Sequence, residues 1–178
     1  DEIEELLKRL RDIVRKIRED HERLSRESER INKDARRRHD EMLRRLEELL
    51  RKVEKEVRTE ELIKRVEEEI RRIIEEARRI NEEVDKRSED VVRTMKELND
   101  RVDKDIDRVI DELRKRIRDE KVKRDIERIR KEVKEESKRL NDHIRDNERR
   151  NKESSEELNR RIKKIADEVR ELLEKLKT

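Results

Sequence analysis

Apolar residues recur along this chain three or four residues apart, which is the spacing of one face of an α-helix. The first series begins at Ile3 and continues to Val57. The phase of the apolar spacing breaks before Leu62 and again before Val122. Thr59 lies just before the first resumption of the pattern, and Asp119 lies just before the second. Both of these side chains are suited to capping a helix N-terminus. The pattern therefore predicts three helices, at about residues 2–57, 60–117 and 120–177.

The apolar positions of all three predicted helices repeat about every 3.6 residues, which is the period of an undistorted α-helix. Such a repeat closes after 18 residues, and Val66, Val84 and Val102 follow one another at this interval. Adjacent apolar pairs such as Ile73-Ile74 widen the stripe, so that one helix can contact two neighbours. We expect long, nearly straight helices of about 85 Å, at a rise of 1.5 Å per residue.

Short connections between the predicted helices favour antiparallel neighbours. Residues 1–178 are therefore predicted to form a single elongated domain, an all-α, single-chain, up-down-up three-helix bundle with coiled-coil-like packing. With turns near residues 59 and 119, facing residues of the first two helices have numbers that add to about 120. Facing residues of the second and third helices add to about 240, and those of the parallel first and third helices differ by about 120.

Polar residues interrupt the apolar series, and this register groups them into layers. The predicted layers are His21 with Asn99 and Asn141, His39 with Asn81 and Asn159, and Asn32 with Ser88 and Asn151, and Ser28, Asn147 and Ser155 add to the central third. A buried polar group costs free energy unless it is hydrogen-bonded. Asparagine supplies donors and an acceptor, and a neutral histidine supplies one of each. We expect each layer to satisfy itself and to set the helix register.

Composition limits the core to a thin one. Charged residues make up 61% of the chain and hydrophobic residues 28%, with no Gly, Pro, Cys, Phe, Trp or Tyr. Such a polar chain can fill the narrow stripe of a helical bundle but not a thick globular core. High charge is also typical of disorder, but the formal net charge is only +3 and the aliphatic residues are periodic.

Charge and hydropathy argue against two kinds of partner. Acidic and basic residues are interleaved, and even the basic run Arg36-Arg37-Arg38 is followed closely by the acidic pair Asp40-Glu41. We therefore expect no nucleic-acid partner. No apolar run approaches the ~20 residues of a membrane span, so we expect a soluble protein. No targeting segment is evident, which leaves localisation unknown.

The straight 18-residue geometry, the three equal helices, the charged surface and the layered Asn, His and Ser positions resemble computationally designed parametric helical bundles with buried hydrogen-bond networks. The resemblance covers all 178 residues. It implies a monomeric or self-assembling scaffold without a natural partner. Turns without glycine depart from many such designs.

The histidines are the only candidates for chemistry. His21 and His39 lie about 27 Å apart along one helix, and each layer offers one imidazole and two amides, whereas zinc prefers several His, Cys or carboxylate ligands. His143 falls beside the apolar series and is predicted at the boundary or surface. Ser154-Ser155 fits small polar core positions better than a nucleophile. We therefore expect no metal, no cofactor, no small-molecule ligand and no catalytic residue.

Three functions fit these features. The leading hypothesis is a designed structural scaffold that is a monomer, because the apolar residues are about as many as one three-helix core consumes. The alternative is a self-assembling module, such as a homo-oligomer or a helix-swapped bundle, with pH-sensitive histidine layers. A spectrin-like or tropomyosin-like spacer is a third hypothesis, which the absence of aromatic residues and the shared register of the polar layers oppose.

Overall fold

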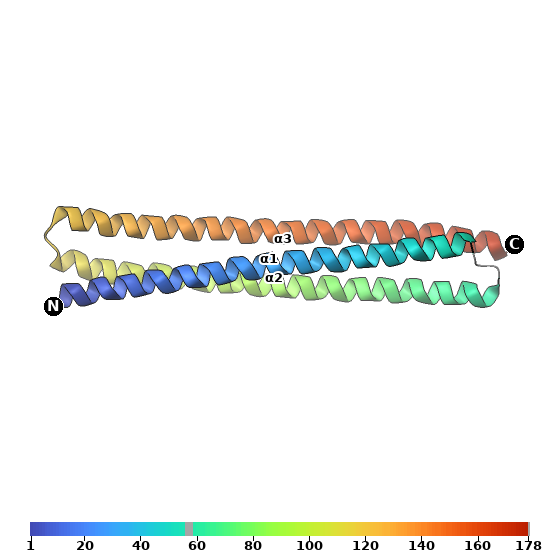
Figure 1. The fold of residues 1–178 in the computed structure, drawn as a ribbon, viewed down its shortest axis with the longest axis horizontal. Coiled ribbons are helices and arrows are strands. Elements are labelled where there is room, and N and C mark those ends of the chain that lie inside the picture. The colour runs from blue at the N-terminus through green and yellow to red at the C-terminus, as the bar shows by residue number, and fades with distance from the viewer. Residues whose placement is uncertain (56–58, 178) are drawn as a thin grey trace. The chain divides into compact units, whose positions relative to one another are not determined.

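The computed structural model describes residues 1–55 and 59–177. It contains three α-helices, α1 (Glu2–Lys55), α2 (Glu60–Arg116) and α3 (Glu120–Lys177), which are labelled in Figure 1. The prediction of an all-α three-helix bundle is confirmed, and α2 and α3 begin at the predicted residues. The predicted end of the first helix, at residue 57, lies outside the described residues.

The helices begin at residues whose side chains cap the free backbone N–H groups of a first turn. Thr59 Oγ1 accepts a hydrogen bond from the backbone N of Leu62 at 3.3 Å, and Asp119 Oδ1 accepts one from the backbone N of Lys121 at 2.9 Å. Both predicted caps are thus formed, and Asp1 caps α1 in the same way. Acidic residues follow in each first turn, where they favour the positive end of the helix dipole.

Internal contacts divide the chain into two units, and each helix contributes one segment to each of them. Unit 1 comprises Asp1–Glu29 and Glu89–Asn147. Unit 2 comprises Arg30–Ser88 and the described residues from Glu148 onward. The two units are described separately below.

Unit 1 has the predicted helix directions. Arg18 of α1 donates two hydrogen bonds to Glu136 of α3, at 3.1 and 3.2 Å, and these residues are 118 apart in number, as parallel helices require. Asn99 of α2 contacts Asn141 of α3, and their numbers add to 240, as in an antiparallel pair. The core between these segments is aliphatic, and Ile110, Leu113 and Val133 are fully buried.

Unit 2 follows the same register. Arg38 and Arg45 of α1 pair with Glu83 and Glu76 of α2 at 2.9 and 2.6 Å, and the numbers of each pair add to 121. These charged groups are partly exposed, so each pair contributes little to stability, typically about 0–1 kcal/mol. Stability therefore rests on buried aliphatic side chains, among them Leu46, Ile73 and Val169.

Two apolar positions depart from the predicted stripe. The pair Ile73-Ile74 was expected to widen the buried face, but Ile74 is 39% exposed whereas Ile73 is fully buried. Leu176, at the predicted end of the third apolar series, is also 39% exposed, because it lies in the last turn of α3. These are the exposed large apolar side chains among the described residues. Across residues 1–55 and 59–177, no helix combines the length and hydropathy that crossing a membrane requires.

Candidate functional site

The candidate site is the set of polar side chains inside the two units. Each occupies a position of the apolar helical stripe, so the local periodicity that forms the helix also directs the polar group inward. Buried polar or charged residues of the described chain are His21, Ser28, His39, Ser88, Ser137, Asn147 and Asn151.

The His39 layer of unit 2 connects all three helices. His39 Nε2 lies 2.9 Å from Asn81 Oδ1 on α2, and its Nδ1 lies 2.7 Å from Ser154 Oγ on α3. Because an amide oxygen only accepts, Nε2 carries the proton and Nδ1 accepts from the serine hydroxyl. Asn81 then donates from Nδ2 to Asn159 Oδ1 at 3.4 Å. A neutral imidazole therefore uses both ring nitrogens.

This layer matches the predicted set with two differences. His39, Asn81 and Asn159 are brought together, but Asn159 is exposed rather than buried, because it lies at the edge of the packed face of α3. Ser154 supplies the α3 contact to the histidine in its place. Its neighbour Ser155 has a buried hydroxyl oxygen without a hydrogen-bond partner.

The Asn151 layer of unit 2 also joins three helices. Asn32 Nδ2 donates to Asn151 Oδ1 at 3.0 Å, and Asn151 Nδ2 donates to Ser88 Oγ at 3.4 Å. Asn32 was expected to face Ser88 directly, with Asn151 one residue out of register. The structure instead places Asn151, which is 3% exposed, between them.

The His21 layer of unit 1 is split into two pairs. Asn99 Nδ2 donates to Asn141 Oδ1 at 2.9 Å, as predicted. His21 forms no hydrogen bond with either amide, which corrects the predicted three-residue layer; its Nε2 lies 3.3 Å from Ser137 Oγ. Asn99 Oδ1 is buried without a partner. Ser137 lies about one helical turn from the expected level, toward the N-terminus of α3.

A further polar cluster in unit 1 reaches solvent. Asn147 Nδ2 donates to Ser28 Oγ at 2.9 Å and lies 3.4 Å from His143 Nε2. The same His143 nitrogen is 3.3 Å from Glu29 Oε1, and the histidine side chain is 40% exposed. His143 thus lies at the boundary, where it was predicted.

Burial controls the acid–base behaviour of the two core histidines. It lowers the pKa of His39, because a charged ring would lose its water, although the hydrogen bond to Asn81 and the charge of Asp40 act in the opposite direction. Burial likewise lowers the pKa of His21, although the carboxylate of Glu136 partly opposes it. Neutral imidazoles are therefore the favoured form near pH 7.

Ser137 is the buried polar residue that the sequence reasoning missed. It lies four residues after Val133 and three before Leu140, on the apolar series of α3, so its spacing was the available signal. Within residues 1–55 and 59–177, no three His, Cys, Asp or Glu side chains gather in a way that could hold a metal ion.

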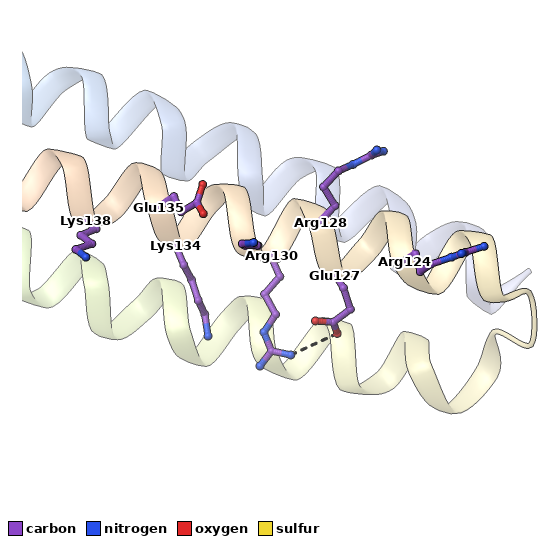
Figure 2. A pocket seen from close by; sticks show the side chains of 8 residues that line it. Arg124, Glu127, Arg128, Arg130, Lys134, Glu135 and Lys138 are labelled. Atoms are coloured by element: carbon purple, nitrogen blue, oxygen red, sulfur yellow. Dashed lines mark ion pairs between the residues drawn. The ribbon is translucent and has the colours of Figure 1, made fainter.

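Two surface concavities of unit 1 lie outside these layers. One is an open hollow of about 690 Å³ along α3, where Figure 2 shows Arg130, Lys134 and neighbouring charged side chains. Its cations are partly neutralised, since Arg130 pairs with Asp107 at 2.5 Å and with Glu127 at 3.7 Å, the pair dashed in Figure 2. The other is an apolar groove of about 570 Å³ between α1 and α3.

Comparisons with known proteins give a structural likeness but no sequence family. No protein-family model and no curated protein matches the chain. A solved structure described as a computationally designed three helix bundle is similar with a TM-score of 0.37 and 15% sequence identity, over 98% of this chain and 85% of that one.

Proposed function

We propose that this chain is a designed structural scaffold in which buried polar layers set the register of the three helices. The supporting observation is the His39 layer, where side chains of α1, α2 and α3 form one continuous set of hydrogen bonds. Apolar packing alone is tolerant of displacement, because one aliphatic layer resembles the next. A displaced polar layer instead leaves buried donors and acceptors unpaired, at a cost of about 1–3 kcal/mol for each group.

The combination of residues supports a structural rather than a catalytic role. The polar groups of the His39 layer are occupied by one another, and the histidine itself is 3% exposed. A catalytic base needs access to a substrate and a positioned nucleophile. The hydrogen bonds of His39 leave neither ring nitrogen available for such a role.

The register function can be tested with cysteine pairs in unit 2. Arg38→Cys with Glu83→Cys places thiols at positions that form an ion pair in the parent chain, whereas Arg38→Cys with Arg79→Cys is displaced by one helical turn. In the parent background we expect a short bifunctional thiol reagent to link the first pair far faster. The measurement is the initial crosslinking rate of each pair.

The same pairs are then compared in a background that lacks the layer, with His39→Leu, Asn81→Leu and Ser154→Ala. We expect the crosslinking rate of the displaced pair to rise and that of the aligned pair to fall, because apolar layers tolerate the shift in register. Unchanged relative rates in the two backgrounds would show that the helix connections and apolar packing set the register without the layer.

A further inference from the structure

The apolar groove of unit 1 is lined by residues of two parallel helices. Its floor consists of Leu7, Leu10 and Val14 from α1 and of Val122, Ile126 and Ile129 from α3. Leu7, Val122 and Ile129 remain only half-buried. The lined part of α1 extends from Leu7 to Glu22, which is about 22 Å at 1.5 Å per residue. A groove of about 570 Å³ falls in the range of protein ligand sites, about 300–1,000 Å³.

The two rims beside this floor carry opposite charges. Arg11 and Arg15 project from α1, and Asp125 and Glu132 line the groove from α3. Arg15 has only a loose ion pair with Asp12, at 3.6 Å between largely exposed groups. Asp125 accepts a hydrogen bond from Arg128 at 3.1 Å, again between exposed groups of one helix. Because such exposed pairs are weak, these rim charges are available to a partner.

The oppositely charged rims end at the ion pair of Arg18 with Glu136. The two hydrogen bonds of that pair join α1 to α3 directly, at 3.1 and 3.2 Å, next to the last apolar residues of the floor. Glu19 and Glu22 line the groove further along α1, so the cationic rim is confined to the part beside the apolar floor. The charge pattern is thus specific to the segment that is also apolar.

We propose that this groove binds one amphipathic α-helix that has an aliphatic stripe, an acidic flank and a basic flank. Leucine-type side chains at helical spacing would fill the floor, as in other complexes in which a helix occupies a groove. The acidic flank would meet Arg11 and Arg15, and the basic flank would meet Asp125 and Glu132. Opposite charges on the two rims match the two flanks of a single helix, and complementary charges govern partner choice more than affinity.

The test uses three synthetic 21-residue helical peptides with the same leucine stripe. One has glutamate on one flank and lysine on the other, one has glutamate on both flanks, and one has lysine on both. We expect the mixed peptide to bind the intact chain at least about ten-fold more tightly than either of the others, as measured by fluorescence anisotropy. Strongest binding of the all-glutamate peptide would indicate general attraction to a net-positive protein and overturn the proposal.

Two protein variants locate the site. Ile129→Glu places a charge in the groove floor, and it should weaken binding of the mixed peptide at least about ten-fold. Ile74→Glu is the matched control, because Ile74 is an exposed isoleucine of α2 outside the groove, and it should leave binding unchanged. Circular dichroism establishes that both variants remain helical. Equal binding by both variants would place the peptide elsewhere.

A third variant tests the rims. With Arg11→Glu and Arg15→Glu both rims become acidic, so preference should change to the all-lysine peptide. An unchanged preference would overturn the role of the rims. If light scattering instead detects a dimer that Ile129→Glu dissociates, and no peptide binds, the occupant is a second copy of this chain and the proposal is wrong.

Discussion

The side chain of Asn151 links three helices at one level of unit 2. It accepts a hydrogen bond from Asn32 of α1 and donates one to Ser88 of α2. Its burial means that water cannot replace these partners if they are lost. Asn159 lies two turns further along the same helix, but it is exposed and has a single long hydrogen bond, to Asn81. The two asparagines thus form a natural matched pair.

Replacing Asn151 should therefore cost much more stability than replacing Asn159. We expect Asn151→Ala to lower the free energy of unfolding by about 1–3 kcal/mol, because Asn32 and Ser88 lose their partner. Asn159→Ala should change it by less than about 0.5 kcal/mol. Urea denaturation followed by circular dichroism measures both. Equal losses would contradict the buried position of Asn151.

Removing the whole layer should be milder than removing its centre. With Asn32→Leu, Ser88→Ala and Asn151→Leu together, no buried group is left unpaired, so stability should match or exceed that of the parent. The mass of the triple variant is measured alongside its denaturation curve, because loss of a buried polar layer favours alternative oligomers. A triple variant with a lower free energy of unfolding than Asn151→Ala would show that the layer contributes net stability.

The core histidines should make stability depend on pH. Since burial lowers the pKa of His21 and His39 in the folded chain, the unfolded chain binds more protons once the pH falls below the ordinary imidazole value of about 6.5. Stability is then lost as the pH falls from about 6.5 through the folded-state pKa values, and none is lost above neutrality. The charges nearby are Glu136, Asp20 and Arg18 for His21, and Asp40 and Arg38 for His39.

The measurement is chemical denaturation at about pH 7.5 and 5.2, which lie on either side of the imidazole pKa and above the carboxylate range near pH 4. A double variant with His21→Asn and His39→Asn is the reference. We expect the parent to lose more stability than this variant between the two pH values. A parent that loses no more than the variant would mean that the histidines are not buried and neutral.

At the scale of residues, the sequence predicted which levels of the bundle contain polar side chains more accurately than which side chains form hydrogen bonds with one another. The residue-number rule placed Asn99 beside Asn141 and His39 beside Asn81. It could not predict that His21 contacts Ser137 instead of an amide, or that Ser154 rather than Asn159 contacts His39 from α3. Several side chains lie within one turn of each histidine, and rotamers decide among them.

Short polar residues determine where α2 and α3 begin in this chain, which contains neither glycine nor proline. Thr59 and Asp119 each occupy the position before a helix, and each accepts a hydrogen bond from the first turn. Their short side chains reach N–H groups that have no partner inside the helix. The start of α2 and α3 was predictable for this reason, because the break in apolar phase and the cap coincide.

Loss of a cap should destabilise the chain in a way that a neighbouring change does not. Asp119→Ala should lower the free energy of unfolding by about 0.5–2 kcal/mol. Arg118→Ala, in the same connection and at an exposed position, should change it by less than about 0.5 kcal/mol. Denaturation curves of the two variants test this. Equal effects would show that the connection is held by something other than the cap.

The whole molecule carries 61% charged residues, yet most of its described apolar side chains are buried. Ile74 and Leu176 are the exposed large apolar residues of the described chain, and neither is among the residues that line the groove of unit 1. Isolated exposed apolar residues are ordinary on monomeric proteins. The up-down-up directions could be predicted from connection length, whereas the unfilled groove could not, because it depends on how closely α1 and α3 approach each other.

We therefore expect the isolated chain to be a monomer. Light scattering should give a mass of 22.2 kDa that does not change with concentration. A stable mass twice as large would favour the self-assembling alternative. Repeating the measurement with Ile74→Lys and with Ile129→Glu would then identify which apolar surface is responsible.

The 18-residue repeat also creates a hazard during folding. A helix displaced by one repeat in the collapsed chain still buries aliphatic side chains along the part that overlaps its neighbours, so it forms a kinetic trap. The two histidine layers limit this hazard because they are chemically unequal: His21 bonds a serine, whereas His39 bonds an amide and a serine. A chain whose two layers were made identical should refold with an added slow phase, as displaced molecules wait to unfold before they can pair correctly.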